Sequence, residues 1–195
     1  YLIKEVSFGN DGNISQEKLE NCINSDLANN YGNLCQRVIS FTEKNLKLNM
    51  PKNYKFNSDD QIVLNKFNTN YSELLNYIDN QDINSYVNFI VNQLFAANKY
   101  FNDQEPWNKK DNKERLNTIV FVALELIRKI SIMLYPIIPN TSLKVLSVFN
   151  VKEKEIFFES IKNDDFLNKI NKISKIDILF KKINNDWFTL SFRSR

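Results

Sequence analysis

Apolar residues recur every three or four positions through most of the chain, which is the spacing of amphipathic helices. Ser15 and Ser58 are good N-cap residues, with acidic residues shortly after each, and Pro136 and Pro139 end a long apolar stretch. In the third stretch, Val87, Ile90, Leu94 and Phe95 are expected to face inward. The pattern predicts helices at about 15–45, 58–78, 83–101, 112–134 and 140–149, the fourth being the most apolar and therefore central.

The two ends of the chain depart from this helical pattern. Residues 1–8 alternate loosely and precede the turn-forming residues 9–13, which predicts a short extended segment followed by a turn. After Val151 the pattern weakens, and the apolar run 176–180 is predicted to form a short strand. Gly32 interrupts the first helical stretch, where it predicts a bend or a close helix contact.

The composition supports a helical fold and limits the modes of ligand binding. The 195 residues include only 3 Gly and 4 Pro, fewer turn formers than a strand-rich domain of this length needs. The formal net charge of +3 is too small for a protein that holds nucleic acid by bulk charge alone. Any RNA binding is therefore expected to depend on a local site with specific contacts.

Several kinds of catalytic and metal site are excluded by the residue types present. The sequence has no histidine, which rules out a Ser/His triad, a histidine zinc site and histidine acid–base catalysis within this chain. Cys22 and Cys35 lack metal-ligand spacing, and on one helix they would lie about 20 Å apart, too far for a disulfide. No pair of carboxylates stands out as an acid–base site. We therefore expect neither catalytic residues nor a metal site in this chain.

Asn33 and Arg37 are the first candidate recognition residues. They lie four positions apart on the first predicted helix, so they project from one face, roughly opposite the apolar stripe. A carboxamide offers a donor and an acceptor, and a guanidinium offers a planar set of donors, so together they suit the edge of an exposed base. The alternative is an ordinary solvated helix face, which spacing alone does not exclude.

Trp107 is the second candidate, because it follows Pro106 in a polar loop with little apolar cover. A stiffly held, exposed indole is a stacking platform for an unpaired base, whereas the alternative is a tryptophan folded back onto the bundle. Lys109, Lys110 and Lys113 follow it and are candidates for contacts to phosphates, although nearby acidic residues dilute this patch.

Taken in order, these motifs resemble the anticodon-binding part of bacterial and organellar methionyl-tRNA synthetases. Residues 4–15 (KEVSFGNDGNIS) resemble the segment that joins the catalytic and anticodon-binding domains, and residues 24–37 (NSDLANNYGNLCQR) resemble the first long helix of the latter. Residues 97–107 (ANKYFNDQEPW) and 135–139 (YPIIP) resemble a loop and a proline break of the same domain. The resemblance covers about residues 1–150, with a weaker match at Leu179–Phe180.

The resemblance implies an all-α helical bundle typical of class I synthetases, with a short extended segment before it and a less regular tail after it. Its expected parts are a linker (1–14), a helical anticodon-binding domain (15–150) and a C-terminal helix or strand with a tail (151–195). In the family, the matching residues read the CAU anticodon. Carried over by motif, Asn33 and Arg37 would contact the first anticodon base, and Trp107 would stack in the same pocket.

The partners implied are the anticodon loop of methionine tRNA and the catalytic domain of the same enzyme, with neither a membrane nor DNA as partner. The family's His-Ile-Gly-His and Lys-Met-Ser-Lys-Ser motifs are absent, so ATP and methionine are expected to bind only the parent enzyme's catalytic domain. The first residue is Tyr1 and not Met, so a preceding catalytic domain is expected. The expected location is a bacterial cytoplasm or an organelle. The alternative is a helical interaction module or a degenerate remnant that has lost RNA binding.

Overall fold

A computed structural model of the chain describes residues 1–6 and 11–183. Within these residues the chain is helical and forms no strand, which confirms the predicted all-α class. The α-helices are α1 (Leu2–Glu5), α2 (Gln16–Asn21), α3 (Asn33–Leu46), α4 (Ser58–Thr69), α5 (Tyr71–Asp79), α6 (Ile83–Gln104), α7 (Lys113–Leu134) and α8 (Pro139–Val148). A π-helical stretch, η1 (Cys22–Gly32), joins α2 to α3, and the 3₁₀ turns are η2 (Pro106–Asn108), η3 (Glu153–Glu155), η4 (Phe158–Lys162) and η5 (Phe166–Lys169).

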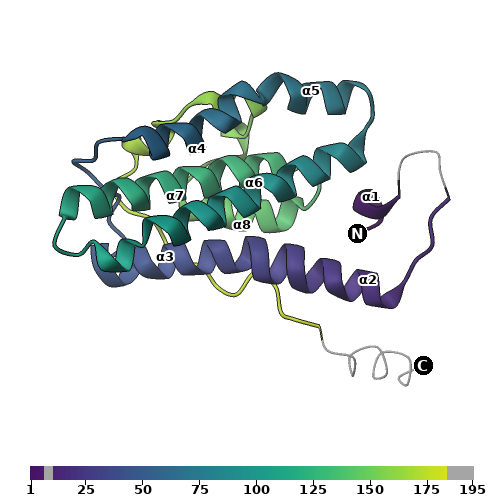
Figure 1. The fold of residues 1–195 in the computed structure, drawn as a ribbon, viewed down its shortest axis with the longest axis horizontal. Coiled ribbons are helices and arrows are strands. Elements are labelled where there is room, and N and C mark those ends of the chain that lie inside the picture. The colour runs from purple at the N-terminus through teal and green to yellow at the C-terminus, as the bar shows by residue number, and fades with distance from the viewer. Residues whose placement is uncertain (7–10, 184–195) are drawn as a thin grey trace.

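The first predicted helix is confirmed as one long rod made of α2, η1 and α3 (Figure 1). It begins where the N-cap signal predicted, because the Ser15 hydroxyl accepts a hydrogen bond from the Lys18 amide at 3.4 Å. It ends at Lys47, whose φ of 53° places it in the left-handed conformation that commonly follows a helix. Cys22 and Cys35 are both free thiols on this rod.

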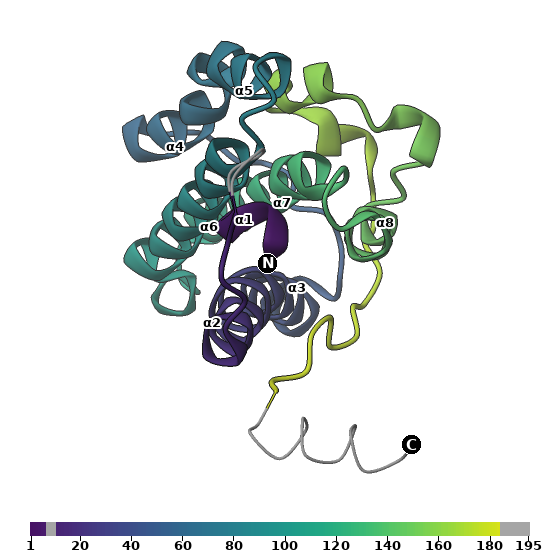
Figure 2. The ribbon, with the colours of Figure 1, turned by 90° about the vertical axis from the view of Figure 1, so that its right-hand side faces the viewer.

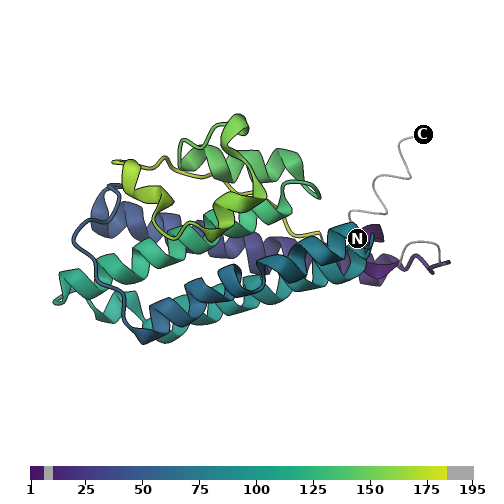
Figure 3. The same ribbon diagram turned by 90° about the horizontal axis from the view of Figure 1, so that it is seen from above.

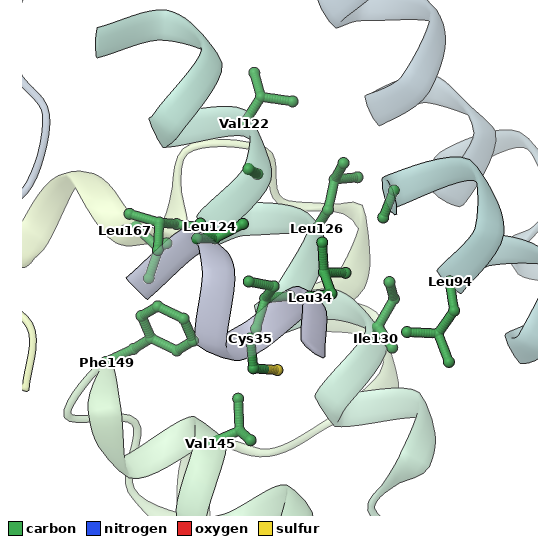
Figure 4. Close-up of a cluster of buried hydrophobic side chains, with 14 of the residues drawn as sticks. Leu34, Cys35, Leu94, Val122, Leu124, Leu126, Ile130, Val145, Phe149 and Leu167 are labelled. Atoms are coloured by element: carbon green, nitrogen blue, oxygen red, sulfur yellow. The ribbon is translucent and has the colours of Figure 1, made fainter. Parts of the chain in front are cut away.

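Helix α7 forms the centre of the bundle, as its apolar sequence predicted. Every residue from Thr118 to Leu134 is buried, and α3, α6 and α8 all pack around α7 (Figure 2). Figure 4 shows part of this core, in which side chains from four helices and the C-terminal coil meet. The labelled residues are Leu34, Cys35, Leu94, Val122, Leu124, Leu126, Ile130, Val145, Phe149 and Leu167.

Three details of the middle of the chain differ from the prediction. The helix expected at 58–78 is two helices, α4 and α5, separated at Asn70. The N-cap of α4 is Asn57 instead of Ser58, because the Asn57 carboxamide accepts from the Asp60 amide and the Asp60 carboxylate accepts from the Asn57 amide. Phe95 faces outward and is 60% exposed, since its neighbour Leu94 already occupies the core-facing side of α6.

The N-terminus forms the short helix α1, so the prediction of an extended segment is wrong for Leu2–Glu5. Tertiary contacts account for the helix, because the Lys4 ammonium pairs with Asp26 at 2.6 Å and the Asn84 carboxamide donates to the Lys4 carbonyl. Alternation over a few residues is a weak signal that such contacts override. The predicted turn at 9–13 lies partly outside the described residues, and the tail after Asn184 lies wholly outside them.

The chain after α8 is an irregular coil that crosses the bundle, in agreement with the predicted weakening of the helical pattern (Figure 3). The strand predicted at 176–180 is wrong, because no neighbouring strand in the described part of the chain pairs with it. The coil is held by buried charges of α7: Arg128 Nη2 donates to the carbonyls of Ser160 and Asn163, and Lys129 pairs with Asp164. None of the described helices is both long enough and apolar enough to cross a bilayer.

Candidate functional site

Trp107 is presented at the surface by the turn that ends α6. Glu105 adopts a left-handed φ of 46°, and Pro106 then opens the 3₁₀ turn η2. Pro106 is buried, whereas Trp107 is 40% exposed, so the proline anchors the turn and the indole remains accessible. The structure therefore does not support the alternative of a tryptophan folded back into the core.

Phe101 links Trp107 to Arg37. Its buried ring lies edge-on to the indole, with 6.2 Å between ring centroids, and the Arg37 guanidinium lies 5.6 Å from the centroid of the same ring. Arg37 Nη2 also donates a 2.6 Å hydrogen bond to Asn102 Oδ1 on α6. These contacts fix the direction of the guanidinium and leave its remaining N–H groups for a ligand.

The side chains around Phe101 line a surface hollow of about 380 Å³, which we call the Arg37–Trp107 hollow. It combines aromatic surface with a guanidinium, an ammonium, a carboxamide and a hydroxyl. An unpaired base needs this combination, because its faces stack on aromatic rings and its edges take hydrogen bonds. The lining residues are Gln36, Arg37, Ser40, Phe41, Lys44, Phe101 and Trp107.

Asn33 does not line the Arg37–Trp107 hollow, although the motif placed all three side chains in one pocket. It is exposed and faces a neighbouring hollow of about 420 Å³, which we call the Asn33 hollow. Gln36 lines both, so the two hollows adjoin along α3. The lining residues of the Asn33 hollow are Ala28, Asn29, Gly32, Asn33, Gln36, Ile178, Leu179, Phe180 and Lys182.

A lysine that was not predicted as a site residue lies beside Arg37 and Trp107. Lys44 lines the Arg37–Trp107 hollow, whereas Lys109, Lys110 and Lys113 line neither hollow. A signal for Lys44 was present in the sequence, because it lies seven positions after Arg37 and therefore on the same face of α3. Gln36 and Ser40 share that signal, since they lie three and seven positions after Asn33.

A buried polar network fixes the end of α6 from which the Trp107 turn departs. The Asp60 carboxylate accepts hydrogen bonds of 2.6 and 3.0 Å from the Arg115 guanidinium and one of 2.5 Å from the Tyr100 hydroxyl. Arg115 also donates to Gln104, the last residue of α6. Burial, together with the Asp60 carboxylate, holds the pKa of Tyr100 well above its ordinary value, so the phenol stays a hydrogen-bond donor.

The side chains that line these hollows can stack, donate hydrogen bonds and accept them. Among the residues that the structure describes, no group of three or more His, Cys, Asp or Glu side chains could hold a metal ion. The two hollows have no carboxylate in their linings, and their cations suit a ligand with negative charge.

Comparisons with known proteins agree on one family. A family model described as the anticodon binding domain of methionyl tRNA ligase matches residues 50–192. The chain is 32% identical over 186 residues to a methionine–tRNA ligase from Thermotoga maritima, and 31% identical over 188 residues to one from Rickettsia prowazekii. Each match spans 94% of this chain but only 29% and 37%, respectively, of those relatives.

A solved structure has a similar fold. The apo form of Mycobacterium tuberculosis methionyl-tRNA synthetase superimposes with a TM-score of 0.84 at 26% sequence identity. The match covers 94% of this chain and 38% of that structure. The chain therefore spans well under half the length of the proteins it resembles.

Proposed function

Because the chain belongs to the family of anticodon-binding domains of methionyl-tRNA ligases, we propose that it recognises the CAU anticodon of methionine tRNA. The observation that carries the proposal is the Arg37–Trp107 hollow. There an accessible indole and a guanidinium held by Asn102 both lie against the ring of Phe101. Anticodon bases are unpaired, so they offer both a stacking face and a free hydrogen-bonding edge.

The magnitudes of these contacts suit specific recognition by a chain with little net charge. Stacking on an aromatic side chain is worth about 1–3 kcal/mol per base, and a bidentate contact discriminates by roughly the same amount. The stack on Trp107 adds affinity for any base, whereas a bidentate contact from Arg37 is enough for a preference of about tenfold, since each 1.4 kcal/mol is tenfold. Lys109, Lys110 and Lys113 remain proposed contacts to phosphates farther along the RNA backbone.

We further propose that the chain works as part of a methionine–tRNA ligase. Attachment of methionine to tRNA with ATP would then take place in a catalytic domain of the same enzyme, which is the second proposed partner. The relatives' names support this assignment, and their bacterial sources support the proposal of a bacterial cytoplasm as its location.

The test is the binding of RNA stem-loops to the chain and to a Trp107→Ala variant. We expect the wild type to prefer a stem-loop carrying CAU over one with a scrambled loop. The variant should bind the CAU loop more than tenfold more weakly, because it loses one stacking contact. Fluorescence anisotropy at fixed salt measures both affinities.

Phe157→Ala is the matched control, because Phe157 is an exposed aromatic residue that lines neither hollow. Its affinity for the CAU loop should equal that of the wild type. Equal binding of CAU and scrambled loops by the wild type would contradict the proposal and favour the alternative of a helical interaction module or a remnant without RNA binding.

A further inference from the structure

We propose that an apolar cavity beneath α1 binds a small uncharged ring compound, of about the size of toluene or indole. The cavity has a volume of about 160 Å³, and we call it the α1 cavity. Figure 2 shows α1 lying between the rod and the helices α6 and α7, all of which contribute to the lining. The inference does not depend on RNA recognition, so it stands or falls separately from the proposed function.

The first half of α6 forms one wall of the α1 cavity. Val87, Val91 and Leu94 share a face of this helix, because residues three, four and seven positions apart lie on one side. Val87 and Leu94 are buried, but Val91, which lies between them on the same stripe, is only half-buried. The stripe is therefore well covered at both ends and poorly covered in the middle, where an occupant would pack.

The facing wall comes from the rod, and it is apolar although it contains a tyrosine. Leu27 is half-buried there, and Tyr31 is fully buried. The Tyr31 hydroxyl forms a 2.7 Å hydrogen bond with the Ser131 hydroxyl, which itself donates to the Ile127 carbonyl. The proton of Tyr31 is thus used by Ser131, which does not line the cavity, so this wall offers a ligand mainly carbon atoms.

The remaining walls are also aliphatic. Leu134, Ile137 and Ile138 line the cavity from the break between α7 and α8. Ile3 lines it from α1 and is nevertheless 45% exposed. An apolar occupant would cover part of Ile3 and of Val91, and removing apolar surface from water is favourable.

The charged groups of the α1 cavity select for an uncharged ligand. The Lys4 ammonium and the Asp26 carboxylate both line it, but they pair with each other at 2.6 Å. Cys22 lines it too, and burial raises the pKa of its thiol, which is therefore neutral at pH 7. A charged ligand would lose its hydration without gaining an unpaired counter-charge from the lining side chains.

The volume of the α1 cavity sets the size of the ligand. An apolar cavity of about 150 Å³ is large enough to bind benzene. The α1 cavity, at about 160 Å³, therefore accommodates one aromatic ring with a small substituent, or the fused rings of indole. Val87 and Phe101 are separated by about 21 Å along α6, so this cavity is remote from the Arg37–Trp107 hollow.

Titration of the chain with toluene and indole, followed by methyl NMR, tests the proposal. We expect both to bind with a Kd of about 1 mM or lower, which is within the limit for ligands of so few atoms. Benzoate, a charged ring of nearly the same size as toluene, should bind at least about tenfold more weakly. Indole at ten times its Kd should also raise the Tm of the chain by about 3 °C.

Val91→Phe should abolish binding of both rings, because its side chain fills the poorly covered middle of the α6 stripe. Ile62→Phe is the matched control, since Ile62 is an exposed aliphatic residue of α4 that does not line the cavity. It should bind like the wild type. Leu27→Phe fills the cavity from the rod and replaces Val91→Phe if thermal unfolding shows that Val91→Phe is not folded. Either filled variant should keep the wild-type affinity for a CAU stem-loop.

Each outcome of the titration decides for or against the proposal. Loss of binding in a folded, filled variant, with binding retained in Ile62→Phe, supports it. Equal binding by the filled variant and the wild type would place the ligand elsewhere and overturn it. Benzoate that binds as tightly as toluene would overturn the assignment to uncharged ligands. If neither ring binds the wild type, the proposal is wrong, and an apolar side chain of a protein partner becomes the better occupant.

Discussion

At the scale of single residues, Lys44 and Arg37 offer different chemistry to the same hollow. It lines the Arg37–Trp107 hollow from the same helix as Arg37, but an ammonium is a compact point charge and does not match the edge of a base. Arg37 has a planar fork of donors, one of which is already committed to Asn102. At this scale we therefore propose that Arg37 reads the base and that Lys44 contacts a phosphate.

Replacement of Lys44 by Ala should weaken binding of CAU and scrambled stem-loops equally. Loss of one phosphate contact should also reduce the slope of log affinity against log salt concentration by about 0.7, the value for single strands. Titrations at several salt concentrations measure both effects. A selective loss of CAU binding would show instead that Lys44 reads a base. The control is Lys154→Ala, because Lys154 is an exposed residue of η3. This variant should keep the wild-type slope of log affinity against log salt concentration.

At the scale of elements, the position of the Trp107 turn depends on how three helices are tied together. Asp60 on α4 is fully buried and accepts hydrogen bonds from Tyr100 on α6 and Arg115 on α7. Arg115 also holds Gln104, two residues before Pro106. The same contacts that stabilise the bundle therefore fix the point from which the indole is presented.

Asp60→Ala should destabilise the fold by about 3–5 kcal/mol, because it leaves the Arg115 guanidinium without its partner in a mostly buried position. The free energy of unfolding in urea measures the change. Asp59→Ala is a close control, since Asp59 lies in the same first turn of α4, is exposed and makes one 3.2 Å hydrogen bond with Gln104. Asp59→Ala should lower the free energy of unfolding by less than about 0.5 kcal/mol. Similar losses of stability for Asp59→Ala and Asp60→Ala would contradict this account of the network.

At the scale of the whole molecule, buried charges of α7 join the helical bundle to the C-terminal coil. Glu125 accepts from the Leu167 amide and pairs with Arg128, while Lys129 pairs with Asp164. Burial lowers the pKa of Lys129 below its ordinary value of 10.5, although Asp164 opposes this effect. The coil that leads to residues 176–183 is thus held by groups whose charge is costly to bury.

The sign of the Lys129 shift predicts a pH dependence of stability. Between the lowered pKa and 10.5 the unfolded chain binds more protons than the folded chain, so the free energy of unfolding rises with pH in this window. The stability gained when Lys129 loses its proton is lost again as pH falls through the folded-state pKa of Lys129. Relative to Lys129→Met, the wild type should therefore gain stability as pH approaches 10.5, measured by urea unfolding at each pH.

Lys99→Met provides the reference for that measurement, because Lys99 is largely exposed and pairs with Asp103 at the surface. The difference in stability between this variant and the wild type should stay nearly constant over the same pH range. If the wild type instead loses stability relative to Lys129→Met as pH rises, the effect of Asp164 on the pKa of Lys129 is larger than the effect of burial.

The sequence by itself determined the class of fold and most of its helices. Apolar periodicity is set by local geometry, so the rod after Ser15, helix α6 and the central helix α7 were predictable within a few residues. The recognition face of α3 was predictable for the same reason, because residues three, four and seven positions apart must share a face. The turn at Pro106–Trp107 was predictable from the restriction that proline imposes on its neighbours.

Only the tertiary structure decided which distant residues meet. The break at Asn70, the helix at Leu2–Glu5 and the failure of residues 176–180 to form a strand depend on packing partners that lie far away in the sequence. The surroundings of Asn33 have the same origin, since one side of its hollow is formed by Ile178, Leu179, Phe180 and Lys182, about 145 positions later in the chain. Local periodicity determines which face of its own helix a side chain occupies. The groups that this side chain meets are determined by contacts between segments far apart in the sequence.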